Sequence, residues 1–352
     1  MGNKQNQTAG DNSQQLQASN MIVNLGIDEK RAREIYNEMN LQLRKDYSDE
    51  AFKVAISRIG EFENRLMLKM EKVDGAIQIF TDPSFQLLLL EAQKTAASSE
   101  RSTDYDLLAE LLIERFNKGE NRVIRAGITR AVKIVDEISD DALLGLTVSH
   151  SFSNIFPVTG DINQGLDVLN NLFGKIFYGE LPIGKDWLDH LDILDTIRID
   201  SFGELKKVQQ YYPEMLTGYI DVGIEKNTEN HNMAVEILHN NGISLNILVD
   251  HIFNTNFVRL NITNKDRINS LSLTDQQKSS LNTVYDLYKK DEALRQSNIQ
   301  KFMHEWDKLE NLKKLREWWD NISSSFELTS VGKVLAHSNA QRCDQTIPPL
   351  NR

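Results

Sequence analysis

Residues 83–150 constrain the fold of this chain more than any other stretch, because apolar residues recur through them at helical spacing. The clearest segment is 121–138, in which Ile124 and Ile128 lie on one face and Lys133 falls on the opposite face. The same apolar face carries Gly127, Ala131, Val135 and Ile138. One side of this segment is typical of a buried core, and the other is typical of a solvated surface.

Three more apolar stripes flank this segment at the same spacing. They consist of Phe85, Leu88, Leu89, Ala92 and Ala96, then Tyr105, Leu108, Leu112 and Phe116, and finally Leu143, Leu146 and Thr147. Ser139 or Asp140 is suited to cap the last of these helices. The polar breaks between the helices are short, which favours antiparallel neighbours. We therefore expect a mainly α protein, built as a multi-helix bundle or array.

The composition is that of a folded, acidic chain. Its 352 residues are 40% hydrophobic and 26% charged, and the formal net charge is −11 at pH 7. Such a charge argues against a surface built as a whole to neutralise phosphates, although a local basic patch is compatible with it. The single cysteine, Cys343, excludes an intramolecular disulfide and a cysteine-based zinc site, and it suits a reducing, cytoplasmic setting. No run reaches the roughly 18 apolar residues of a membrane helix, so we expect no membrane span.

The chain divides into five expected regions. They are a polar N-terminal tag at 1–27, a long helical segment at 28–80, a central helical domain at 81–180, a mixed α region at 181–270 and a C-terminal helical region at 271–352. Within the second region, 49–73 predicts one long charged helix with an apolar stripe. We expect it either to pack on the bundle or to act as an intersubunit stalk.

Residues 10–27 differ from the rest because they are rich in Asn and Gln and suit a turn followed by two short extended pieces. An isolated pair of strands is marginal in water, so copies from other subunits are natural partners, while the alternative is a disordered tail. The residues expected to mediate such oligomerisation are Asn12, Gln14, Leu16, Gln17, Met21, Val23 and Leu25. The segment resembles a short β-type Gly-Asp-Asn-Ser tag found ahead of helical domains in bacterial proteins, which implies self-assembly.

The central array has a recognisable order of sequence features. A Pro-initiated Leu-rich helix is followed by a Leu-Leu-Ala-Glu-Leu-Leu helix and then by Ile-Ser-Asp-Asp-Ala-Leu at 138–143. This order resembles the helical domain of the bacterial abortive-infection alpha group. The resemblance implies a bacterial protein from an antiphage setting and brings no catalytic residue with it.

The C-terminal region ends in a short strand, a Thr or Ser cap and a helix, over residues 326–336. This Leu-Thr-x-x-Gly-x-x-Leu-Ala ending resembles winged-helix domains, so a winged-helix-like region that binds nucleic acid is an alternative interpretation. Its expected nucleic-acid contacts are Lys313, Lys314 and Arg316.

Familiar catalytic motifs are missing from the sequence, which contains no Gly-x4-Gly-Lys-Ser/Thr loop, no Gly-x-Ser-x-Gly elbow and no His-Glu-x-x-His pair. The richest ionisable cluster is Asp186, Asp189, His190, Asp192 and Asp195. A metal or hydrolase site is one interpretation of this cluster, and the exposed face of an amphipathic helix is the favoured one. A second set, His231, His239, Asp250 and His251, has no spacing that predicts convergence. We expect no catalytic residue, no metal and no cofactor.

Two further groups have a structural and a functional interpretation. Arg122, Arg125, Arg130 and Lys133 concentrate positive charge, which suits either a solvated helix face or a contact with a nucleic-acid backbone or an acidic partner. The spacing of Trp306, Trp318 and Trp319 favours a core position over a base-stacking platform. Taken together, these patterns predict a non-enzymatic, homo-oligomeric interaction protein, with an antiphage accessory role implied by the resemblance. Its expected partners are itself and another protein.

Overall fold

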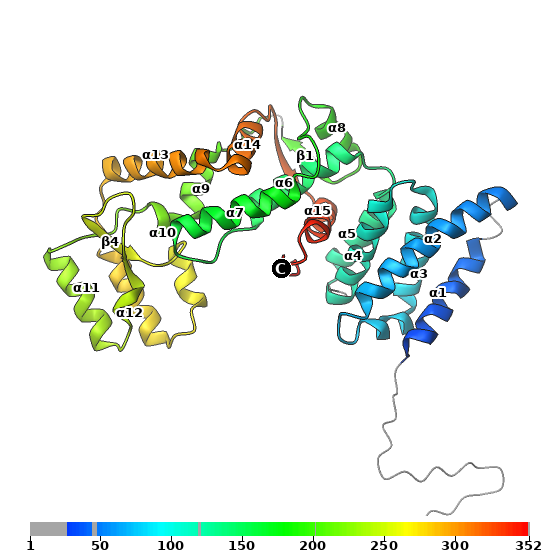
Figure 1. Cartoon of the computed structure of the whole chain (residues 1–352), viewed down its shortest axis with the longest axis horizontal. Helices are drawn as coiled ribbons and strands as arrows, with labels where there is room; N and C mark the ends of the chain where they lie inside the picture. Colours follow the sequence, from blue (N-terminus) through cyan, green and yellow to red (C-terminus); the bar gives the residue numbers. More distant parts are fainter. Residues whose placement is uncertain (1–26, 44–47, 119–120, 201, 351–352) are drawn as a thin grey trace, which may run out of the picture.

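The computed structural model describes residues 27–43, 48–118, 121–200 and 202–350, and the chain is mainly helical over them (Figure 1). This confirms the predicted fold class in its main feature. No helix in these ranges is both long and apolar enough to cross a membrane. The seven residues predicted to mediate oligomerisation, Asn12 to Leu25, lie outside the described residues.

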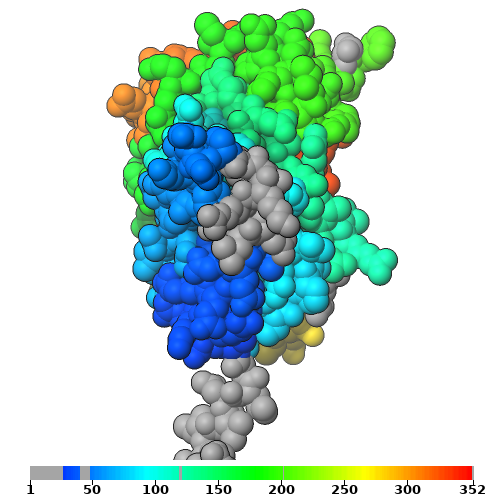
Figure 2. Space-filling view, turned by 90° about the vertical axis from the view of Figure 1, so that its right-hand side faces the viewer, coloured from blue at the N-terminus to red at the C-terminus, as the bar shows by residue number. Residues whose placement is uncertain are grey.

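One end of the molecule consists of the first helices (Figures 1 and 2). They are α1 (Glu29–Leu43), α2 (Asp49–Met70), the 3-10 helix η2 (Ala76–Thr81), α3 (Pro83–Ser98), α4 (Ser102–Lys118) and α5 (Arg122–Ile134). The long helix predicted at 49–73 is α2, and its buried stripe packs against α3 and α4. It is therefore a packed helix of the array and not a projecting stalk.

Local capping fixes where these helices begin. Asp82 accepts a hydrogen bond from the Ser84 backbone N–H just before α3, and Asn121 accepts two from the first turn of α5. Ser139 caps α6 (Asp140–Asn154) in the same manner. Each side chain satisfies backbone donors that have no partner inside the helix. The predicted starts of these three helices are confirmed.

The C-terminal helix α15 (Ser330–Cys343) completes the core of this array. It packs against α4, α5 and α6, although all the elements from α7 to β5 lie between α6 and α15 in the sequence. The Leu335 and Ala336 side chains are fully buried there. Next to it, α7 (Ile162–Ile176) buries an apolar stripe of Ile162, Leu166, Leu169, Phe173 and Ile176.

A two-stranded ribbon joins distant parts of the chain. Strand β1 (Ile197–Asp200) pairs antiparallel with β5 (Ser325–Leu328), and Ile197 lies opposite Leu328. Helix α8 (Asp186–Ile193) contacts β1, and the remaining helices of this middle part are α9 (Val208–Met215), α10 (Thr217–Ile220), α13 (Glu292–Lys308) and α14 (Glu310–Trp319). Trp306, Trp318 and Trp319 are buried, which confirms the prediction that they belong to the core.

The opposite end of the molecule has its own hydrophobic cluster (Figure 1). An antiparallel sheet of order β2-β4-β3 is covered there by two helices. The elements are β2 (Ile224–Glu225), α11 (Glu229–Asn240), η3 (Leu245–Ile247), β3 (Leu248–Asp250), β4 (Phe257–Leu260), η4 (Lys265–Ser270) and α12 (Asp275–Asp286). Thr274 and Gln277, whose spacing in the sequence is that of a capping box, form one at the start of α12.

The spacing of Phe202, Leu205, Val208 and Tyr212 predicts a helix that ends at Pro213, and residues 219–224 suit a short strand. The structure differs at each of these points. Phe202, expected on a helical apolar face, is 99% exposed, because its backbone N–H donates to Asp200 in a turn after β1. Pro213, expected to end a helix, lies inside α9, which continues to Met215. The strand expected at 219–224 is confined to β2, since Tyr219 belongs to α10.

The expectation of a winged-helix-like region at the C-terminus is also wrong. A wing is a hairpin within the domain, but within 271–350 the structure has one strand, β5, and this strand pairs with β1. The following helix, α15, is embedded between α5 and α6 and is no part of a separate module. The predicted strand, Thr329 cap and final helix are themselves confirmed.

Candidate functional site

A cleft of about 460 Å³ opens where the start of α4, the start of α6, the loop after α7 and helix α15 meet. Four carboxylates line it, those of Asp104, Asp140, Asp141 and Glu180. The single cation among the described lining residues is Arg342. The lining is therefore acidic, and we call this cavity the acidic cleft.

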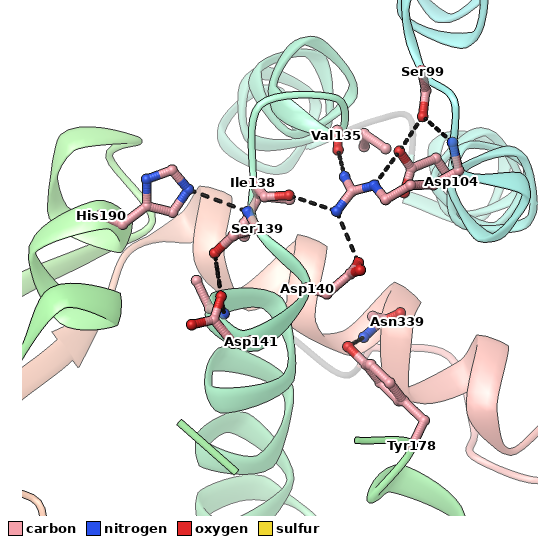
Figure 3. A network of polar contacts seen from close by, with 12 residues as sticks. Ser99, Asp104, Val135, Ile138, Ser139, Asp140, Asp141, Tyr178, His190 and Asn339 are labelled. Carbon is pink, nitrogen blue, oxygen red and sulfur yellow. Dashed lines mark hydrogen bonds and ion pairs between the residues drawn. The ribbon is translucent and has the colours of Figure 1, made fainter. Parts of the chain in front are cut away.

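The floor of the acidic cleft is held by Arg101. Its guanidinium donates to the Asp104 carboxylate at 3.0 Å, to Asp140 at 2.8 Å and to the backbone oxygens of Val135 and Ile138 at 2.7 and 2.8 Å (Figure 3). Val135 is the C-cap residue of α5, and Ile138 lies in the connection that leads to α6. Arg101 therefore fixes the start of α4 against the turn between α5 and α6.

The Asp104 carboxylate is buried, with 2% of the residue exposed. Burial raises its pKa above the ordinary value, although the Ser99 hydroxyl and the Arg101 guanidinium both act to lower it. Ser99 Oγ donates to the same oxygen that Arg101 contacts. Because its hydrogen bonds come from two fixed neighbours, the position of Asp104 is set before any ligand arrives.

The opposite wall is organised by Asn339 of α15, a residue with no exposed surface. Its amide nitrogen donates to Thr147 Oγ1 at 2.8 Å and to the Tyr178 hydroxyl at 3.2 Å (Figure 3), and its oxygen accepts from Arg342 Nε at 2.7 Å. The Arg342 guanidinium also lies 5.1 Å from the centre of the Tyr178 ring. The orientation of the Asn339 amide is fixed, because its nitrogen donates to two oxygens and its oxygen accepts from Arg342.

Tyr178 is a neutral phenol at neutral pH. Burial raises its pKa to about 12, while the hydrogen bond with Asn339 and the charge of Arg342 act in the opposite direction. Tyr178 is nevertheless 42% exposed, and Asp141 and Glu180 beside it are exposed to solvent as well. The cleft thus combines a rigid hydrogen-bonded interior with accessible negative charge at its edge.

The predicted cluster at 186–195 is not gathered into one site, although two of its carboxylates share a cationic neighbour. His190 Nε2 accepts the backbone N–H of Ser139 at 3.2 Å, which ties α8 to the edge of the acidic cleft (Figure 3). Asp195 pairs with Arg198 at 2.9 Å, and Asp192 lies 4.0 Å from the same guanidinium. Within the described residues no group of three or more acidic, His or Cys side chains is arranged to hold a metal ion.

The predicted histidine set is dispersed as well. His251 is fully buried and lies 3.2 Å from the Asn298 amide nitrogen, whereas Asp250 is exposed and pairs with Lys226 at 2.7 Å. His231 and His239 are on α11. These residues are not brought together.

The three cations predicted to contact nucleic acid lie on α14, each beside a local partner. Arg316 pairs with Asp307 at 2.6 Å, Lys313 lies 4.0 Å from Glu317, and Lys314 lies over the Phe177 ring. Their role in nucleic-acid binding stays a prediction. On α5, Arg130 and Lys133 lie 3.9 Å from Asp195 and Glu91 respectively, whereas Arg125 faces a separate hollow described below.

Sequence reasoning missed the residues that build the acidic cleft. Arg101, Tyr178, Asn339 and Arg342 follow no common motif and come from widely separated segments. The one usable signal was Ser99 with Asp104 around the predicted start of α4, a pattern typical of a helix N-terminus. That pattern says nothing about α15, which supplies the other wall.

Comparison with known protein families gives a match that covers nearly all of the described residues. A family model described as ":-like" matches residues 26–347, and the chain belongs to that family. The matched range includes every lining residue of the acidic cleft and both hydrophobic clusters. The description names no activity, substrate or partner. Searches of curated proteins and of solved structures gave no match.

Proposed function

We propose that this protein is a non-enzymatic interaction protein whose acidic cleft binds a basic segment of a protein partner. The observation that carries the proposal is a cavity of about 460 Å³ with four carboxylates in its lining. Cavities of this size are in the range that receives a ligand or a few side chains. A lysine or arginine side chain offers the opposite charge together with an apolar stem.

The arrangement of the carboxylates supports binding of a cation. Asp104 and Asp140 are already engaged by Arg101. Asp141 and Glu180 stand at the exposed edge, where an incoming lysine or arginine can reach them. The ring of Tyr178, a lining residue that is 42% exposed, provides apolar surface for the stem of that side chain. The net charge of −11 would also speed the approach of a basic partner at low salt.

The interior of the cleft supports a binding role more than a chemical one. Asp104 is held by Ser99 and Arg101, and Tyr178 is held by Asn339. These side chains are committed to structure and hold the walls in place. A preformed site loses little conformational entropy when its partner binds.

The test measures binding of a fluorescent Arg- and Lys-rich peptide by anisotropy at low and moderate salt, beside a peptide of the same length that carries Glu in place of the basic residues. The double variant Asp141→Asn and Glu180→Gln removes the two rim charges, and its Asn keeps the oxygen that accepts the Ala142 backbone N–H in the first turn of α6. We expect roughly tenfold weaker binding, the effect of about 1.4 kcal/mol from two partly exposed pairs.

The matched control removes two exposed charges elsewhere, through Asp167→Asn on α7 and Glu236→Gln on α11. This control should bind the basic peptide as the unchanged protein does. Equal weakening in both double variants would show a general effect of net charge and would overturn the proposal. Equal binding of the Glu-containing peptide would overturn it too.

We also propose that the protein is a homo-oligomer assembled through its N-terminal tag. Support comes from the Asn- and Gln-rich sequence at 10–25, since identical polar strands can stack with side-chain ladders. Light scattering of the full chain and of a chain that begins at Asp28 tests this, at several concentrations. A mass that falls to the monomer on truncation is expected, and equal masses would contradict it.

We propose that the role of this interaction protein in the cell is that of an antiphage accessory protein. It is supported by the leucine pattern at 83–147 and by its resemblance to abortive-infection proteins. Plaque counts on a bacterial host with and without the protein test it, and the Asp141→Asn, Glu180→Gln variant links the outcome to the cleft. Protection that is lost in this variant is expected, whereas a host that is never protected would contradict the role.

A further inference from the structure

A second hollow lies at the other end of α4, between the start of α3, the end of α4 and the start of α5. Its volume is about 520 Å³. Of the described residues that line it, Arg115, Lys118 and Arg125 carry positive charge and Asp82 carries negative charge. We call this cavity the basic hollow, and it is unusual in a chain whose net charge is −11.

Arg115 anchors the basic hollow from within the core. It is 5% exposed, and its Nη2 donates to Ser84 Oγ at 2.7 Å and lies 3.3 Å from Asp82 Oδ2. Burial lowers the pKa of this guanidinium, and the charge of Arg125 lowers it further while Asp82 opposes both. Arg115 and Arg125 are therefore close enough to repel each other.

Asp82 balances only part of this charge. Its carboxylate also accepts the Ser84 backbone N–H at 2.9 Å and the Ser84 hydroxyl, because it caps α3. Burial alone would raise its pKa, but the Ser84 hydrogen bonds and the charges of Arg115 and Arg125 outweigh burial, so the pKa lies below its ordinary value. Asp82 is thus ionised at neutral pH, and three cations against one carboxylate leave a charge of +2 among the described residues that line the hollow.

The position of Arg125 in α5 favours a binding role for the basic hollow over a purely structural one. Arg115 and Lys118 are in the last turn of α4, where positive charge stabilises a helix without any ligand. Arg125, in contrast, lies at the beginning of α5, which has no acidic residue in its first turn. Positive charge at a helix N-terminus is unfavourable, so α5 gains nothing from Arg125 by itself. An anion between these helices would remove the conflict.

We propose that the basic hollow binds the phosphate group of a small phosphorylated molecule. A phosphate monoester carries a charge of about −1.5 to −2 near pH 7, which matches the +2 of the hollow better than a single carboxylate does. Arginine is suited to hold phosphate oxygens through paired N–H donors. Phe116 and Ile124 also line the cavity, and they offer apolar surface to the remainder of such a molecule. This inference is independent of the acidic cleft.

The experiment titrates the full chain with inorganic pyrophosphate and with ADP by calorimetry at low ionic strength. The test variants are Arg125→Gln and Lys118→Gln, which change residues that are not fully buried. Arg115 is left intact, because its loss would leave Asp82 without its buried partner and could prevent folding. The matched control is Arg130→Gln, which removes the same charge from the same helix outside the hollow.

The expected result is measurable binding of at least one probe and a loss of about tenfold in affinity in each test variant. The Arg130→Gln variant should bind as the unchanged protein does. Tighter binding of ADP than of pyrophosphate would support a contact of the organic part with Phe116, and equal binding would support a site for the phosphate group alone. Failure of both probes to bind at millimolar concentration, or equal weakening by Arg130→Gln, would overturn the proposal.

Discussion

His150 Nε2 lies 3.1 Å from His337 Nδ1, and this contact joins α6 to α15 in the middle of the core. The second nitrogen of His337 lies 2.9 Å from the Pro348 carbonyl oxygen. Since that carbonyl only accepts, His337 carries its proton on Nε2 and accepts from His150 through Nδ1. The pair of neutral rings therefore connects two helices and the C-terminal segment.

The first prediction concerns acid stability. Burial lowers the pKa of His150 to about 3, and it also lowers the pKa of His337. Below about pH 6.5 the unfolded chain takes up protons on these residues, whereas His150 in the folded chain stays neutral down to about pH 3. The free energy of unfolding should therefore fall by about 1.4 kcal/mol per pH unit through His150, with a further decrease through His337, and should not depend on either residue above pH 6.5.

Urea unfolding at a series of pH values from neutral to mildly acidic measures this slope. The His337→Gln variant should show a shallower slope than the unchanged protein, and the exposed His239→Gln control should retain the full slope. Identical slopes in all three proteins would refute the assignment of neutral, buried imidazoles.

The second prediction concerns Glu114, which is 1% exposed. Its two carboxylate oxygens have no hydrogen-bond partner among the described residues. Burial raises its pKa to about 7, although Lys118 opposes the shift. Its ionisation destabilises the folded state progressively as pH rises from the unfolded value near 4.3 to about 7. Glu114→Gln should thus stabilise the protein at pH 8, by an amount on the order of 3 kcal/mol, and have little effect near pH 4.5.

The comparison variant for this prediction is Glu110→Gln, one helical turn earlier. Glu110 pairs with Lys69 at 2.5 Å and accepts from Gln345 at 2.8 Å, so its neutralisation should destabilise the fold. The denaturation midpoints of both variants, measured at pH 8 and near pH 4.5, test this contrast. Destabilisation by Glu114→Gln at pH 8 would show that the carboxylate has a favourable partner.

The third prediction concerns the Arg101 network. Arg101→Lys keeps the charge, but an ammonium group cannot reach Asp104, Asp140 and two backbone oxygens together. We expect a loss of about 2–3 kcal/mol in the free energy of unfolding, since the buried Asp104 loses hydrogen bonds. The surface variant Arg198→Lys should change stability by less than about 0.5 kcal/mol. Similar losses in the two variants, measured by urea unfolding, would contradict the role of Arg101.

The fourth prediction concerns Gly160, which fits against the end of strand β4. A methyl group at this position would lie 2.1 Å from the backbone of Asn261, and the Gly160 carbonyl accepts from the buried Arg259 at 2.7 Å. Gly160→Ala should therefore destabilise the protein by about 1–3 kcal/mol, because the two segments must separate. Gly60→Ala, in the open middle of α2, should instead stabilise it by up to about 1 kcal/mol. Thermal unfolding of both variants tests the contrast, and a neutral Gly160→Ala variant would show that the loop moves freely.

Helix positions were predictable because their determinants are local. Asp82, Asn121, Ser139 and Thr274 each accept a backbone N–H within the next three residues, so a short window of sequence contains the whole interaction. The apolar stripes of α2, α3 and α7 were predictable for the same reason. Pro213 was misjudged because neighbouring packing holds α9 together past a residue that removes one backbone donor.

The candidate sites were not predictable in the same way. Two histidines, His150 and His337, meet across 187 positions, and Asn339 reaches Thr147 across 192. Nothing in the spacing of these residues signals their contact. Their burial also determines their chemistry, since it is the surrounding helices that lower the pKa of His150 and raise that of Glu114.

The sequence by itself therefore determined that this is a mainly helical protein, with defined helix starts and buried faces, because capping and amphipathic periodicity act over a few residues. The tertiary structure alone decided that β5 pairs with β1, that α15 closes both the core and the acidic cleft, and that Arg115 and Arg125 share one hollow. The reason is physical: such contacts depend on which apolar faces meet, and helices of similar pattern can meet in many ways until packing selects one.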